Sequence, residues 1–247
     1  MAKLQKEWVP LDITTARGKS RNRIYRVGLE LEGGWNKLPP GTRTIRDGSV
    51  AFNQAVNHVG EMPSGILDVA KDSVTYWGKW LKTNFPHHVN ETCGMHIHAS
   101  FKTAFAYNRL MTAQYPATVV EEFKRWGKKQ GLPDIHPIWP RLDNKSKYCQ
   151  HWFDADCQVD NREKDFNQER KGHRYTVINY CYGRYSTLEC RLLPMMENVE
   201  LATSAIQEFL DITNAFLVAL PLKKEPKERL EHQVNEASDR TMTRLYV

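Results

Sequence analysis

A chain of 247 residues with 40% hydrophobic and 26% charged side chains can bury a sizeable core, and this composition excludes wholesale disorder. The formal charge of +6 and a pI near 9.0 favour anionic partners such as nucleotides, nucleic acid or acidic peptides. No apolar run approaches the roughly 20 residues that span a bilayer, and the first residues lack the apolar stretch of a signal peptide. We therefore expect a cytoplasmic protein without membrane contact.

Local composition divides the chain into three parts. Five basic residues crowd the segment from Arg17 to Arg26, so residues 1–23 are predicted to be a basic leader, which is either a solvated segment or an arm that contacts nucleic acid. Residues 24–222 carry the regular apolar patterns of one domain. Residues 133–171 are irregular, and we expect them to be an insertion that lies over the functional site. From residue 223 the tail is charged. The five cysteines are odd in number and show no disulfide-like spacing, which fits a reducing compartment.

The first half of the domain alternates strand and helix patterns. Residues 27–32 alternate as a strand, and a loop rich in glycine and proline leads to a tight turn at Asp47-Gly48-Ser49. A short strand is predicted at residues 58–62, where the proline that follows cannot donate to a β-ladder. Apolar residues spaced by three and four from Leu67 to Leu81 predict a helix. The next strand follows at residues 93–100.

The second half of the domain predicts two helices around a strand pair. A helical pattern at residues 119–126 ends near one of two glycines, Gly127 or Gly131. Strand patterns return at residues 175–180 and 186–193, and the short turn between them predicts an antiparallel hairpin. The side chain before the last helical pattern, Asn198, can cap that helix. Elements in this order predict an α+β fold, with an antiparallel sheet covered on one face by helices.

Three of the predicted strands carry ionisable side chains on one face and apolar side chains on the other. Successive side chains of a strand point to opposite faces, so residues two apart share a face. The pairs formed in this way are Glu30 with Glu32, His96 with His98, and Glu189 with Arg191. A sheet that faces only water has no need of imidazoles and carboxylates in this pattern. We therefore interpret the shared face as a functional site.

The residue types on this face are those that bind metal ions. Mg²⁺ prefers carboxylate oxygens and keeps some waters that a substrate can replace. Two glutamates on one strand could equally form an exposed, charged edge, but Glu61 and Glu189 on other strands can complete a ligand set. Alternatively, His96 and His98 could bind zinc, with one of these glutamates as the third ligand. A separate Cys149, His151 and Cys157 cluster matches no zinc motif well.

Glu189 and Arg191, which share one strand face, could have separate roles. The neighbouring carboxylate of Glu189 would bind metal, while the guanidinium forks onto a phosphate or carboxylate oxygen. The alternative is an ordinary salt bridge between the two residues. No GxxxxGK[ST] or GxGxxG segment occurs, so phosphates would be held by metal and arginine rather than by a glycine-rich loop. A GxSxG nucleophile elbow is absent as well.

Five short motifs then occur in a defined order along the chain. They are Gly28-Leu29-Glu30-Leu31-Glu32, Asp47-Gly48-Ser49, Gly60-Glu61, Gly94-Met95-His96-Ile97-His98-Ala99-Ser100 and Thr187-Leu188-Glu189-Cys190-Arg191-Leu192. Together they resemble the carboxylate-amine ligases of the glutamine synthetase and γ-glutamylcysteine ligase superfamily, and most closely its small amidoligase branch of phages and bacteria. The resemblance covers the layout of residues 24–220, whereas the insertion has no part in the motifs.

This resemblance implies an antiparallel sheet shaped as a funnel that holds ATP and two or three Mg²⁺ or Mn²⁺ ions. ATP would phosphorylate a carboxylate, and an amine would attack the acyl phosphate to form an amide. The resemblance also implies roles for individual side chains. These are Glu30, Glu32, Glu61 and Glu189 as metal ligands, His96 as a metal ligand or catalytic group, His98 as a nucleotide contact, Arg191 as the group that stabilises the transferring phosphoryl, and Arg174 and Asn179 as contacts to nucleotide or substrate. Asp47 would orient or deprotonate the incoming amine.

Two other classes of function remain open from the sequence. The chain could be a ligase-like protein that binds nucleic acid through its basic leader without turnover, which salt-sensitive DNA binding would indicate. It could instead be a zinc-dependent hydrolase that activates water at His96 and His98 and needs no nucleotide. For the ligase, the acceptor could be a peptide, a protein, a cell-wall component or a modified nucleobase. A phage-encoded enzyme would act in the host cytoplasm.

Overall fold

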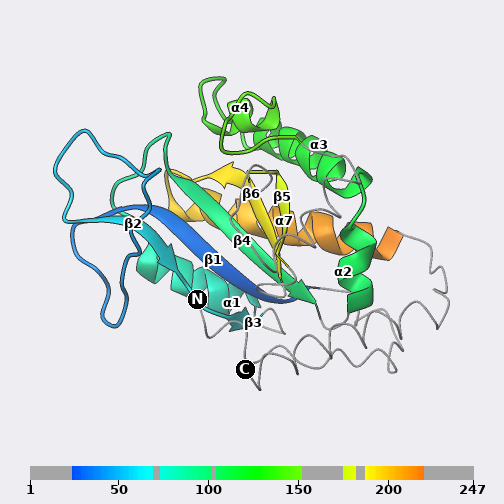
Figure 1. The fold of residues 1–247 in the computed structure, drawn as a ribbon, viewed down its shortest axis with the longest axis horizontal. Coiled ribbons are helices and arrows are strands. Elements are labelled where there is room, and N and C mark those ends of the chain that lie inside the picture. Colours follow the sequence, from blue (N-terminus) through cyan, green and yellow to red (C-terminus); the bar gives the residue numbers. More distant parts are fainter. Residues whose placement is uncertain (1–23, 69–72, 102–103, 152–174, 182–186, 220–247) are drawn as a thin grey trace, which may run out of the picture.

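The structure, a computed structural model, describes residues 24–68, 73–101, 104–151, 175–181 and 187–219 (Figure 1). The predicted leader, the charged tail, Arg174 and much of the predicted insertion lie outside the described residues. Among the helices that are described, none is long and apolar enough to cross a membrane.

The described strands form one six-stranded sheet in which every pairing is antiparallel. Its strands are β1 (Ile24–Trp35), β2 (His58–Pro63), β3 (Leu67–Asp68), β4 (Gly94–Phe101), β5 (Ile178–Cys181) and β6 (Thr187–Pro194). Their order in the sheet is β2-β1-β4-β6-β5, and β3 pairs with the first part of β1. The prediction of an α+β fold built on an antiparallel sheet is therefore confirmed.

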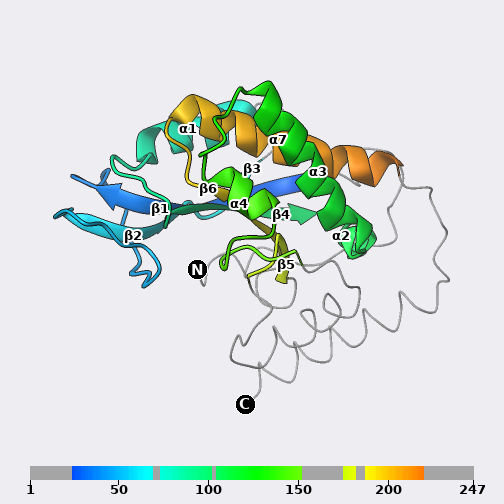
Figure 2. The same cartoon turned by 90° about the horizontal axis from the view of Figure 1, so that it is seen from above.

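Five described helices pack on this sheet and on one another. They are α1 (Ser73–Asn84), α2 (Ala104–Leu110), α3 (Gln114–Lys129), α4 (Ile138–Leu142) and α7 (Val199–Ala219). Helices α1 and α7 lie along the same face of the sheet, and α3 packs on α7 (Figure 2). The short α4 contacts β6 and α3. The layers therefore leave the opposite face of the central strands for other groups.

The boundaries of two helices differ in how well the spacing of apolar residues predicts them. Helix α1 begins at Ser73, so the predicted start at Leu67 is wrong. Leu67 instead belongs to β3 and pairs with Val27 of β1. An apolar side chain can pack against the core from a short strand as well as from a helix. Helix α3 ends at Lys129, and Gly131 follows with a φ of 69°, which favours glycine after a helix.

The hairpin and the last helix agree with the sequence patterns. Strand β5 pairs with β6 as predicted, although it begins at Ile178, later than the pattern that starts at Tyr175. The amide of Leu201 donates to Asn198 Oδ1 at 2.8 Å, so Asn198 caps α7 as predicted. The apolar side of α7, with Phe209 fully buried, then packs into the core.

Both faces of the central strands are buried. On the helix side, Leu29, Ile97 and Leu192 are at most 1% exposed. On the other side, the ionisable residues are buried as well, and Glu32 and His98 are each only 5% exposed. The charged face is therefore not a solvated surface, and its charges must be compensated within the molecule.

Gly60 allows the loop that carries Asp47 to approach β2. Its φ is 143°, and a Cβ at this position would meet the carbonyl oxygen of Ile45 at 2.2 Å. Ile45 and Glu61 exchange two backbone hydrogen bonds of 2.7 and 2.9 Å next to this glycine. Only a residue without a side chain fits both the conformation and the close approach.

We predict that Gly60→Ala lowers the free energy of unfolding by about 1–3 kcal/mol, because alanine is strained at this φ and its Cβ displaces the Ile45 strand bridge. Urea denaturation followed by circular dichroism measures the change. Gly48→Ala is the matched control in the same loop, since a Cβ there meets nothing within 4 Å. Equal stability of the two variants would show that the loop does not depend on Gly60.

Candidate metal and anion site

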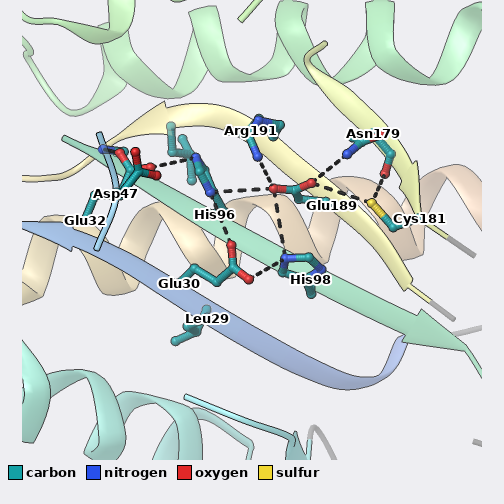
Figure 3. A network of polar contacts seen from close by, with 12 residues as sticks. Leu29, Glu30, Glu32, Asp47, His96, His98, Asn179, Cys181, Glu189 and Arg191 are labelled. Atoms are coloured by element: carbon teal, nitrogen blue, oxygen red, sulfur yellow. Dashed lines mark hydrogen bonds and ion pairs between the residues drawn. The ribbon is translucent and has the colours of Figure 1, made fainter. Parts of the chain in front are cut away.

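The pairing of four strands brings the ionisable residues into one row. Glu30 of β1 lies opposite His96 of β4, and His98 of β4 lies opposite Glu189 of β6. At the other side of β1, Glu32 lies opposite Glu61 of β2. Figure 3 shows the row from the face opposite α7. The structure thus brings together residues that the sequence places up to 159 positions apart, from Glu30 to Glu189.

The two histidines connect the carboxylates at the centre of the row. His98 Nε2 lies 3.2 Å from Glu30 Oε1, while its Nδ1 is 3.0 Å from the hydroxyl of Thr187. His96 lies among three carboxylates, with Nδ1 3.4 Å from Glu30 Oε2 and 3.6 Å from Glu189 Oε1, and Nε2 3.7 Å from Glu32 Oε1. Each imidazole therefore contacts acidic groups from more than one strand.

The carboxylate of Glu189 is fixed from both sides. Arg191 Nη1 donates to Glu189 Oε1, and Asn179 Nδ2 donates to Oε2 at 2.8 Å. Asn179 is the residue of β5 directly opposite Glu189. The sequence left open whether Arg191 pairs with Glu189 or points to a ligand, and the structure shows the ion pair, buried at both partners.

The pKa values of the central groups favour the charged forms of both the glutamates and His98. Burial raises the pKa of Glu30, but His98 and His96 outweigh it and hold that pKa well below its ordinary value of 4.5. Burial also raises the pKa of Glu189, yet Arg191 and the histidines bring it down to about 2. Burial lowers the pKa of His98, whereas the two glutamates raise it, to a net value of about 9. At neutral pH these charges compensate one another.

Glu61 behaves differently from the central glutamates. Burial raises its pKa, and the charges of Glu30, Glu32 and Asp47 raise it further, to about 8. Its Oε1 is buried and has no hydrogen-bond partner among the described residues. A cation bound next to Glu61 would compensate this surplus of negative charge.

One group of donors has the spacing of a metal site. Ligand atoms of Glu30, His98 and Glu189 all lie within 4.8 Å of one another, and the three residues are buried. From the sequence we expected His96 as the ligand beside these glutamates and His98 as a nucleotide contact. The bond from His98 Nδ1 to Thr187 leaves Nε2 facing Glu30, which is the orientation that a ligating histidine needs.

A pocket of about 320 Å³ opens beside the row. Its lining includes predicted site residues, Glu32, Asp47, His96 and Arg191, together with residues that sequence reasoning missed, Ser49, Thr92, Arg141, Tyr148 and Tyr175. Asp47 is oriented there by the amide and hydroxyl of Ser49, each at 2.7 Å. Asn179 contacts Glu189 and is not among the residues that line the pocket.

Gly94 is a further residue that the sequence analysis did not assign to the site. Its amide donates to Glu32 Oε2 at 2.5 Å and so fixes this carboxylate. A Cβ at position 94 would lie 2.9 Å from that oxygen and 3.0 Å from His96 Nε2. The glycine before the histidine strand was a signal, because close approach of a backbone to a site requires the smallest residue.

Comparison of the chain with protein-family models, with curated proteins and with solved structures found no match. The site itself therefore defines the class. It is a buried cluster of carboxylates and imidazoles on the face of an antiparallel sheet, next to a pocket that is lined by two arginines.

We predict that metal-free protein loses stability as pH rises from 5 to 8 and that Glu61→Gln removes part of this loss. A folded-state pKa of about 8, against an ordinary value of 4.5, means that the folded chain binds more protons than the unfolded chain between these values. Glu61 alone contributes a slope of at most about 1.4 kcal/mol per pH unit, and His98, whose pKa is raised to about 9, adds to the loss above its ordinary pKa of 6.5. Urea denaturation in the presence of a chelator measures it.

Glu121→Gln on the exposed side of α3 is the control for the loss of an acidic group, since the Glu121 side chain is 61% exposed. If Glu61→Gln showed the same pH dependence as the wild type, Glu61 would not be the group that takes up the proton.

Proposed function

We propose that the protein is an ATP-dependent carboxylate-amine ligase, which forms an amide through an acyl phosphate. The observation that supports this most is the group of Glu30, His98 and Glu189 beside a pocket with two arginines. These three residues are not among those that line the pocket, but His96 and Arg191, which both contact Glu189, do line it. Phosphoryl transfer depends mainly on positioning and on neutralising charge, so cation ligands next to a pocket with guanidinium groups favour this chemistry. The sheet would correspond to the funnel that the resemblance implies.

The donor set fits hard divalent cations. Glu30 and Glu189 offer carboxylate oxygens and His98 one imidazole nitrogen, and Glu32, Glu61 and Asp47 add further carboxylates nearby. A set dominated by oxygen suits Mg²⁺ or Mn²⁺ better than the histidine pair considered for zinc, because zinc sites favour nitrogen and sulfur. Such ions, when bound, would neutralise the charge of phosphate oxygens.

The chain's own residues would then have separate roles. Asn179 and Arg191 hold the Glu189 carboxylate in one orientation, and Gly94 does the same for Glu32. Arg191, stacked over the Tyr175 ring at 5.6 Å, presents a planar cation to the pocket. Asp47 is placed on the pocket wall, where it can accept a proton from an incoming amine.

We predict that the protein binds ATP only with Mg²⁺ or Mn²⁺ and that the double variant Glu30→Gln, Glu32→Gln weakens this binding about tenfold or more. The amides keep the shape of the side chains but remove two of the charges that hold the cations. Isothermal titration calorimetry measures the affinity.

The matched control is Glu121→Gln, Glu122→Gln, which removes two acidic groups from the surface of α3. Binding that needs no metal, or that survives the loss of Glu30 and Glu32, would contradict the proposed site. Stoichiometric zinc in the purified protein together with no ATP binding would favour the hydrolase instead.

We predict that Arg191→Lys lowers ADP release about 100-fold, because an ammonium is a point charge and cannot replace the planar fork at the pocket. The rate is measured with the carboxylate and amine that give the fastest ADP release in the wild type. Arg125→Lys on α3 is the control, since the Arg125 side chain is 72% exposed. Full activity of Arg191→Lys would leave Arg191 as a structural partner of Glu189.

A further inference from the structure

Arg141 is a buried cation in the pocket that no motif of the sequence includes. It lies on α4, in the segment predicted to be an insertion, and is only 4% exposed. Its Nη1 donates to the carbonyl oxygens of Arg191 and Leu193 at 3.2 and 2.9 Å, and its Nη2 lies 3.5 Å from that of Cys93. These bonds place the guanidinium at the ends of β4 and β6.

The charge of Arg141 has no counter-ion among the residues that the structure describes. No carboxylate of the described residues lies within 4.0 Å of its guanidinium, and its partners are the neutral carbonyl groups above. Burial accordingly lowers the pKa of Arg141, although Glu32 at longer range opposes this. Burying an unpaired arginine is costly, and three carbonyl bonds use only part of its five N–H groups. A structural clamp alone does not require a permanent charge.

The second arginine of the pocket also has unused donor capacity. Arg191 Nη1 is paired with Glu189, but its Nε is buried and finds no hydrogen-bond partner in the part of the chain that the structure describes. Arg141 and Arg191 line the same pocket, as do Tyr148, Tyr175 and Ser49. A buried donor without an acceptor, beside a second buried guanidinium at a common cavity, indicates a ligand that brings acceptors.

We propose that Arg141 and Arg191 form a subsite for an oxyanion, either a phosphate or a carboxylate group of a substrate. Two guanidinium forks are the side chains that recognise such planar or tetrahedral oxygen groups best. The proposal deepens the proposed function, since ATP or the carboxylate substrate of a ligase would supply the anion. The pocket of about 320 Å³ is at the small end of ligand pockets and suits a group of this size.

The test uses the full chain without metal, titrated by calorimetry with inorganic phosphate in one arm and malonate in the other. Arg141→Met keeps most of the length of the side chain and removes its charge, and Arg125→Met on the exposed surface is the matched control. We expect Arg141→Met to weaken binding of the preferred anion about tenfold or more, and Arg125→Met to leave it within about twofold. The anion that binds more tightly identifies the source as phosphate or carboxylate.

A purely structural role gives a different result. Arg141→Met would then lower stability but bind the anion like the wild type, and this outcome, or no binding of either anion to the wild type, overturns the subsite. If Arg141→Met does not fold, arginine side-chain ¹⁵N spectra replace it. The signal that Arg141→Lys removes must shift when the preferred anion is added to the wild type, and an unshifted signal contradicts the proposal.

The same measurements separate this proposal from the proposed function. If ATP binding depends on metal and Arg141→Met binds the anion like the wild type, the ligase proposal is supported and the subsite is contradicted. If the wild type binds no ATP with Mg²⁺ or Mn²⁺ and Arg141→Met loses anion binding, the subsite is supported and the ligase proposal is contradicted.

Discussion

The compensation of buried carboxylates by buried cations is the constraint on which this structure depends. Glu30 and Glu189 sit on a sheet face with almost no access to water, and an uncompensated carboxylate there would cost several kcal/mol. His98 and Arg191 meet this cost within hydrogen-bond distance, which is why both glutamates stay ionised. Removing one partner therefore disturbs the whole row. Glu61 is surrounded by other carboxylates instead, and burial together with their charges raises its pKa to about 8.

Strand register provides this compensation, since backbone pairing decides which charges face each other. A slip of β4 by one residue would turn His96 and His98 into the apolar layer and bring their neighbours Met95 and Ile97 onto the charged face. The apolar layer under α1 and α7 forbids this, because those neighbours are fully buried in it. The hydrophobic core thus sets the geometry of the polar site, although it contributes no group to the chemistry.

The sequence was sufficient for the features that arise from local periodicity. Alternation with a period of two placed the glutamates and histidines on one face, and the cap at Asn198 was visible in its residue type. Contacts across long separations were not visible. Arg141 meets the carbonyl of Arg191 across 50 positions, and nothing in the residues around Arg141 signals it. His98 joins Glu30 and Glu189 because β4 pairs irregularly with β6 between Met95 and Ile97, a bulge that composition does not encode.

Charge is divided unevenly around the pocket, and this division has consequences for how a ligand would lie in it. In Figure 3, Glu32 and Asp47 lie at one end of the row and Arg191 lies nearer its middle, while Arg141 adds a second positive group to the pocket lining. A ligand with an anionic group and an amine would be oriented by this arrangement alone, since its anion is repelled from the carboxylates and attracted by the guanidinium groups. Because Glu32, Arg141 and Arg191 are buried, salt screens them weakly. The orientation is therefore a property of the folded chain, and a cation added at the carboxylates would strengthen the attraction for an anion without having to reverse it.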